Sequence, residues 1–228
     1  MTEQELANVI WDIKEIIRNL YDDAEVEDVI LPFTLLRRLD CVLDEHRDAI
    51  MKEMNAIKDK PALMQDIKLK SLLKQHGLTF FNTSGLSLER LFGAPNQVGT
   101  SFKTYLEGFT DNVKDILANF VHTDTSSEEL DLSPIYSRLD RHDKLYSVIQ
   151  LFVSRADLHP HIVRNAMLGP VFEIVIRPSK EYRNTKAGQF YSPSKIVRLV
   201  VSLTMCGTAN ELSKPGRAFP FVEPFIHT

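Results

Sequence analysis

The 228-residue sequence predicts a mainly α protein, a helical bundle, and three observations lead to that prediction. In most segments apolar residues recur at intervals of three and four, the spacing that places them on one face of an α-helix. Prolines or Ser-Pro pairs stand where several of these segments begin, and proline is favoured in the first turn of a helix. Residues 78–95 differ from these segments, with a short apolar pair and turn residues. We therefore expect a small β-like excursion near 78–95 beside the bundle.

The first half of the chain predicts three helices. Thr2 and Glu5 form a capping box, and an apolar stripe follows them. Trp11 lies in this apolar segment, so we expect it in the core rather than on a base-stacking surface. Pro32 is expected to open a second, long helix, and Pro61 a third.

The second half continues in the same way. Helical spacing resumes over 101–120, whereas residues 122–131 are acidic and rich in serine and threonine, which is typical of a loop. Ser-Pro pairs at Ser133 and Ser192 combine an N-cap residue with proline at the first helical position. Two further helices are therefore expected to begin there.

The composition, 43% apolar and 25% charged, is that of an ordinary globular protein. No run of about 18 apolar residues predicts a spanning helix, and the N-terminus lacks the pattern of a secretory signal. The two cysteines, Cys41 and Cys206, lie far apart and show no metal or redox spacing. We expect a cytoplasmic protein with free thiols and no membrane partner.

The net charge of −4 hides a basic strip over residues 177–198. Six lysines and arginines stand there against one glutamate, a net +5, so the remainder of the chain carries −9. Such a strip is a candidate for contact with DNA phosphates, and a solvated surface loop is the alternative. The candidate DNA-binding residues are Lys180, Arg183, Lys186 and Lys195.

Several common catalytic signatures are absent. No two of the nine glycines are within two residues of each other, which excludes the usual dinucleotide-binding turn and the phosphate-binding P-loop. The zinc-hydrolase HExxH and serine-hydrolase GxSxG motifs are missing as well. No catalytic residue is therefore assigned.

Two clusters of titratable residues have less specific explanations. His159 and His161 flank a proline, but only Asp157 offers a further ligand nearby, so a helix-flanking loop with a capping histidine is favoured over a metal site. Asp40 and Asp44 lie one helical turn apart among three arginines and are expected to form a charge lattice on the helix surface. No metal site is predicted.

Four blocks of sequence, in order, resemble the modification (methyltransferase, M) subunit of type I restriction–modification systems. They are VILPFTLLRRLDCVLD (29–44), SFKTYLEGFTDNVKDILANF (101–120), DLHPHIVRNAMLGPVFEIVIR (157–177) and GQFYSPSKIVRLVVSL (188–203). The resemblance covers about residues 6–203. It implies an N-terminal helical domain over 1–165, a lead-in to the catalytic methyltransferase domain over 166–203, including the first helix of a truncated α/β domain, and an atypical tail over 204–228.

In that family, the G-x-F-Y-T-P segment lies against S-adenosylmethionine in an adenine-N6 DNA methyltransferase. The resemblance therefore implies cofactor contacts at Phe190, Tyr191, Ser192 and Pro193, with Gly188 permitting the turn. Ser192 stands where threonine is usual, which keeps the hydroxyl group and removes a methyl group.

The sequence departs from the family after this segment. The glycine-rich Asp-Pro-x-x-Gly-x-Gly turn, which approaches the cofactor, is missing, and so is the Asn-Pro-Pro-aromatic signature that binds the flipped adenine. We therefore expect an N-terminal fragment that is inactive alone, although its family is that of site-specific adenine methyltransferases.

Two functional hypotheses follow. The first is the N-terminal part of a type I M subunit that binds DNA and the specificity subunit, in a complex that also contains the restriction subunit. The full-length protein would transfer methyl from S-adenosylmethionine to adenine in DNA. The alternative is a non-enzymatic helical module that binds DNA or a partner protein.

Overall fold

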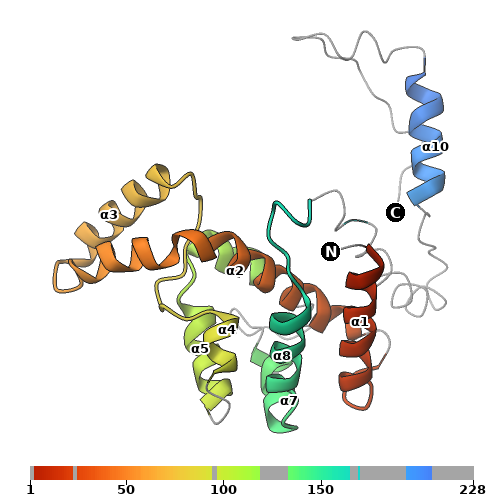
Figure 1. Ribbon diagram of the computed structural model, residues 1–228, viewed down its shortest axis with the longest axis horizontal. Coiled ribbons are helices and arrows are strands. Elements are labelled where there is room, and N and C mark those ends of the chain that lie inside the picture. Colours follow the sequence, from red (N-terminus) through yellow and green to blue (C-terminus); the bar gives the residue numbers. More distant parts are fainter. Residues whose placement is uncertain are drawn as a thin grey trace. The chain divides into compact units, whose positions relative to one another are not determined.

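The computed structural model describes residues 3–22, 25–93, 97–118, 133–164, 169 and 194–206. This part of the chain is mainly helical and contains no strand, which confirms the predicted α class for these residues (Figure 1). The helices are α1 (Glu3–Ile17), α2 (Val26–Asn55), α3 (Ala62–Gln75), α4 (Leu88–Phe92), α5 (Val98–Glu107), α6 (Asp111–Ala118), α7 (Ser133–Arg141), α8 (Leu145–Arg155) and α10 (Ser194–Met205).

The chain forms two compact units, Met1–Ala187 and Gly188–Thr228. Helices α1 to α8 belong to the first unit, and α10 belongs to the second. The domain boundaries expected at residues 165 and 203 stay predictions. None of the described helices is both long and apolar enough to cross a membrane.

In the first unit, α8 packs against α1 on one side and α4 on the other, and α2 crosses the same region (Figure 1). The apolar stripe of α1 explains its place, because its buried residues recur at helical spacing. These residues are Leu6, Val9, Ile10, Ile13 and Ile17. The stripe predicted from the sequence therefore forms one wall of the core.

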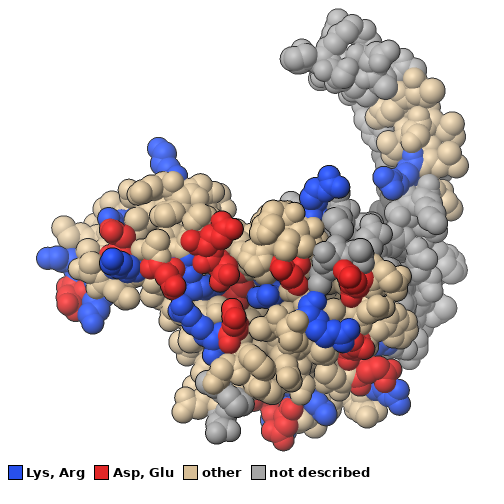
Figure 2. All heavy atoms as spheres, viewed as in Figure 1, with Lys and Arg blue, Asp and Glu red and all other residues tan. Residues whose placement is uncertain are grey.

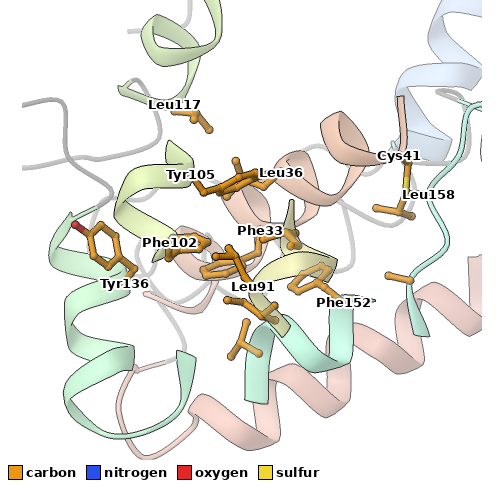
Figure 3. Packing of buried hydrophobic residues seen from close by; sticks show 14 of the residues in the cluster. Phe33, Leu36, Cys41, Leu91, Phe102, Tyr105, Leu117, Tyr136, Phe152 and Leu158 are labelled. Carbon is orange, nitrogen blue, oxygen red and sulfur yellow. The ribbon is translucent and has the colours of Figure 1, made fainter. Parts of the chain in front are cut away.

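The centre of the core is a stack of three aromatic rings from three helices (Figure 3). Phe33 of α2 lies between Phe102 of α5, at 5.4 Å between ring centroids, and Phe152 of α8, at 5.9 Å. All three side chains are almost completely buried. Aromatic pairs at this distance add to the stabilisation that comes from burial alone. The three helices are thereby fixed around one point.

Helix α2 begins earlier than the sequence predicted. Its first residue is Val26, and Pro32 lies inside the helix instead of opening it. Glu27 and Asp28 occupy the first turn, where acidic side chains favour a helix start by interacting with the helix dipole. Pro32 has no N–H group to donate to the carbonyl of Asp28, but it lies in the second turn, where only this one hydrogen bond is lost.

Trp11 was expected in the core, and the structure shows this to be wrong. Its side chain is 57% exposed, and the Lys14 ammonium lies 5.4 Å from the ring centroid. The buried face of α1 passes through Ile10 and Ile13, and Trp11 projects about 100° away from Ile10. An apolar residue next to a stripe is not necessarily part of it.

The excursion expected near 78–95 is described as far as residue 93 and contains no strand. An isolated antiparallel bridge between Asn82 and Phe109 is its only β pairing in the described residues, so the β-like element is not confirmed. Asn82 is completely buried, donates from Nδ2 to the Tyr105 carbonyl (2.8 Å) and accepts from the Ser84 amide (3.0 Å). A polar turn therefore docks the excursion on α5.

A buried ion pair connects α2 to the start of α4. The side chains of Asp40 and Arg47 are each 3% exposed, and Arg47 Nη2 lies 2.8 Å from Asp40 Oδ1. Asp40 Oδ2 accepts from the Leu88 amide (2.6 Å), and Arg47 Nη1 donates to the Leu86 carbonyl (2.7 Å). Burial raises the pKa of the Asp40 carboxyl, and the charge of Arg47 opposes that rise. The predicted surface lattice is therefore wrong for this pair, although Asp44 is exposed.

Replacing Tyr21 by Phe is expected to make the free energy of unfolding fall less steeply as the pH rises above about 10. Tyr21 Oη donates to the Ile135 carbonyl (2.8 Å), and burial raises the pKa of Tyr21 to about 12, against the opposing charge of Arg138. Because the folded state keeps a proton that the unfolded state releases near pH 10.0, the ordinary tyrosine pKa, stability present below pH 10.0 is lost as the pH rises towards 12.

The loss of this hydrogen bond should also cost about 1 kcal/mol at neutral pH. Urea unfolding of both proteins from about pH 8 to 11, on either side of the ordinary tyrosine pKa, measures the two effects. Equal pH slopes in the wild type and in Tyr21→Phe would contradict the prediction.

Candidate interaction surfaces

The sequence-predicted site residues fall almost entirely outside the described part of the chain. This holds for the cofactor-binding residues Gly188, Phe190, Tyr191, Ser192 and Pro193, and for the basic residues Lys180, Arg183 and Lys186. Lys195 lies in α10, but its side chain is not described. Neither set is therefore tested by the structure, and both stay predictions.

Helix α10 carries large apolar side chains that are exposed over most of its length. Their exposed fractions run from 47% to 69%, for Ile196, Val197, Leu199, Val200, Val201 and Leu203. Four of them, at positions 196, 199, 200 and 203, share one helix face. A helix with such a face ordinarily packs against another element.

Helices α2 and α3 form a hairpin whose surface is rich in lysine. Residues 52–76 contain six lysines against three acidic residues, a net charge of +3. Two of the lysines are paired, Lys68 with Glu53 at 2.9 Å and Lys70 with Asp66 at 2.7 Å. Figure 2 shows Lys and Arg side chains gathered around the free end of this hairpin. The surface is suited to a negatively charged partner.

An apolar patch lies on α3 among these lysines. The side chains of Leu63, Met64 and Ile67 are 71%, 57% and 59% exposed, and they lie on one side of the helix. The face of α3 that is buried carries Leu69, Leu72 and Leu73 instead. The sequence does contain a signal for this patch, because the apolar residues of α3 fall on two faces of the helix. Exposed apolar residues in a group mark contacts with macromolecules.

A polar hollow of about 400 Å³ opens beside the start of α5. Its lining includes Gln97, Gly99, Asp140 and Asp143. The Asp140 carboxylate lies so close to Gly99 that a Cβ atom there would be 2.2 Å from Oδ2. Two carboxylates make this hollow unsuitable for a phosphate group, because like charges repel. The DNA backbone is therefore not expected here.

The segment after α8 is held on α2 by two arginines. Arg37 Nε donates to the Ala156 carbonyl (2.8 Å), and Arg38 Nη1 donates to the carbonyls of Leu158 (2.5 Å) and Val163 (2.7 Å). The backbone of residues 156–163 is thereby fixed against the helix. The expected loop after the helix is present at this position.

This packing brings Cys41 of α2 beside Asp157 and His159 of the loop. The Nδ1–H of His159 donates to Asp157 Oδ1 at 2.6 Å, and its Nε2 lies 3.9 Å from Asp44 Oδ2. Burial raises the pKa of the Cys41 thiol, with Arg37 opposing. For Asp157, burial raises the pKa, but the hydrogen bonds from His159 outweigh it and lower the pKa overall. Sequence reasoning missed Cys41 because no local spacing connects it to these residues.

Comparison with known proteins gives one family. A family model described as the HsdM N-terminal domain matches residues 6–152. No curated protein and no solved structure matches the chain. The matched residues include most of α1 and α8 and every helix between them.

Proposed function

Because the chain belongs to the HsdM N-terminal domain family, and so to the modification subunit of type I restriction–modification systems, we propose that its bundle helps that subunit bind DNA and the specificity subunit. The observation that carries the proposal is the family match over residues 6–152. It coincides with the bundle that presents the lysine-rich α2–α3 hairpin. A complex of this kind also contains a restriction subunit, which is proposed as an indirect partner.

The chemistry proposed for the full-length protein is methyl transfer from S-adenosylmethionine to N6 of adenine in DNA. Residues 188–193 would supply one side of the cofactor site. The chain contains neither the glycine-rich turn nor the Asn-Pro-Pro-aromatic signature of the family. The residues that would close the cofactor site and stack the adenine are therefore missing from this sequence.

The 228-residue chain alone is accordingly expected to transfer no methyl group to DNA. Incubation with duplex DNA and tritiated S-adenosylmethionine, followed by counting of the DNA, measures this directly. Incorporation above that of a heat-denatured sample would contradict the prediction.

Duplex binding is expected to be weak and steeply dependent on salt, because contacts with phosphates release counterions. Charge reversal at Lys186 and Lys195 should weaken binding and lower the slope of log K against log salt by about 2 units or more. Fluorescence anisotropy with a labelled duplex measures both quantities. Lys103→Glu with Lys144→Glu is the matched control, because it changes the net charge equally on exposed side chains of the bundle.

Equal losses in the two double variants would show that only net charge matters, and would remove the strip over 177–198 from the proposal. An unchanged affinity in the strip variant would do the same. The lysines of the α2–α3 hairpin would then be the next surface to reverse.

The alternative is a non-enzymatic helical module that binds DNA or a partner protein, and the exposed apolar patch of α3 supports contact with a protein. Replacing Leu63 and Ile67 by Ser shows which kind of partner the patch contacts. Loss of specificity-subunit binding, with DNA binding retained, would assign the patch to the partner protein. Loss of DNA binding alone would assign it to nucleic acid.

A further inference from the structure

A cluster of three metal-ligating side chains lies between α2 and the loop after α8. The Cys41 Sγ atom, a carboxylate oxygen of Asp157 and a ring nitrogen of His159 all lie within 4.8 Å of one another. Cys41 is 2% exposed, and it faces Leu158 of the loop in Figure 3. The side chain of His159 is 21% exposed and that of Asp157 is 50% exposed. The cluster is therefore buried on the helix side and accessible from solvent on the loop side.

We propose that Cys41, Asp157 and His159 bind one Zn²⁺ ion. A thiolate, an imidazole and a carboxylate are the three types of ligand that zinc takes in proteins, whereas Mg²⁺ and Ca²⁺ select oxygen ligands. The His161 ring lies 5.3 Å from that of His159, between centroids, and is exposed. It is the nearest candidate for the fourth position of a tetrahedral site.

The geometry requires only a small contraction. Zinc binds sulfur at about 2.3 Å and nitrogen at about 2.0–2.1 Å, so ligand atoms in a tetrahedral site lie roughly 3.5 Å apart. The distances between the ligand atoms of Cys41, Asp157 and His159, now up to 4.8 Å, must therefore shorten by roughly 1 Å. Rotation of the Asp157 and His159 side chains can provide this, because neither is fully buried.

The backbone around the cluster is held in place by the hydrogen bonds from Arg37 and Arg38 to residues 156–163. These guanidinium groups repel a metal cation, but the charge of Arg37 also opposes the rise in the Cys41 pKa that burial causes. The thiolate is the form of cysteine that binds metal. Before a metal binds, the carboxylates of Asp44 and Asp157 carry −2 against +2 from the two arginines, and burial raises the pKa of the Cys41 thiol. Binding of the metal must therefore displace the thiol proton.

A metal ion at this position would cross-link the loop to the helix. The expected effect of one bound ion is an increase in stability, since a ligand that binds only the folded state stabilises it. At a Zn²⁺ concentration about 100-fold above Kd, the midpoint of thermal unfolding should rise by roughly 5 °C or more.

The direct test is titration of the chelator-treated 228-residue protein with Co²⁺, which replaces Zn²⁺ and reports its ligands by absorption. We expect saturation at one equivalent, with a sulfur-to-cobalt charge-transfer band and the visible bands of a tetrahedral site. Cys41→Ser should abolish the charge-transfer band, and His159→Gln or Asp157→Asn should weaken binding by about tenfold or more. Cys206→Ser is the matched control and should leave the titration unchanged.

The absence of a charge-transfer band in the wild type would overturn the proposal, and so would its loss in Cys206→Ser. His46→Gln distinguishes a second possibility, because the rings of His46 and His76 lie 5.1 Å apart and could bind cobalt without sulfur. Circular dichroism shows whether Cys41→Ser folds. If it does not, the partly exposed His159 and Asp157 decide the matter, and unchanged Co²⁺ affinity in both variants overturns the site.

Discussion

Asp40→Ala is expected to lower the free energy of unfolding by about 3–5 kcal/mol. The substitution leaves the Arg47 guanidinium 3% exposed with no counterion, and it removes the acceptor of the Leu88 amide at the start of α4. A buried charge without a partner costs far more than an exposed one, because neither water nor protein solvates it. Urea unfolding followed by circular dichroism measures the loss.

Two comparisons show whether burial is the cause. Asp66→Ala removes an ion pair of similar length, 2.7 Å, between exposed side chains on α3, and should cost no more than about 0.5 kcal/mol. The double substitution Asp40→Leu with Arg47→Met should be more stable than Asp40→Ala, since it leaves no buried charge. Equal losses in Asp40→Ala and Asp66→Ala would contradict the explanation.

Gly108→Ala is expected to destabilise the protein by about 1–3 kcal/mol, through overpacking where the excursion meets α5. A Cβ atom at this position would lie 2.4 Å from Asn82 Oδ1, 2.6 Å from Ser84 Cβ and 2.8 Å from the Ser84 amide nitrogen. Asn82 is completely buried and bonded to Tyr105, so it cannot move away without losing that bond. The free energy of unfolding in urea reports the cost.

Gly93→Ala is the matched control for this prediction. Gly93 also follows a helix with an ordinary negative φ, −70°, and a Cβ there would meet only the Arg90 carbonyl at 3.4 Å. Reduced backbone freedom in the unfolded state should make this substitution neutral or slightly stabilising, by up to about 1 kcal/mol. A loss as large as that of Gly108→Ala would mean that crowding at Asn82 is not responsible.

The candidate zinc cluster shows where prediction from the sequence ends. His159 and Asp157 are two positions apart, so their pairing is local and was visible in the sequence. Cys41 lies on α2, far earlier in the chain, and no local spacing connects it to these two residues. Bringing its sulfur to the loop depends on the hydrogen bonds of Arg37 and Arg38 to loop carbonyls. No periodicity in the sequence encodes those bonds.

By itself, the sequence determined the helical class, the apolar face of α1 and the resemblance to type I modification subunits, which the family match over 6–152 confirms. These features depend on residues close together in the chain, where helical spacing sets which side chains share a face. Only the tertiary structure decided that Asp40 and Arg47 are buried while Trp11 and Leu63 are exposed. The physical reason is that burial depends on which distant segment covers a face, and that is fixed by packing and hydrogen bonds across the fold.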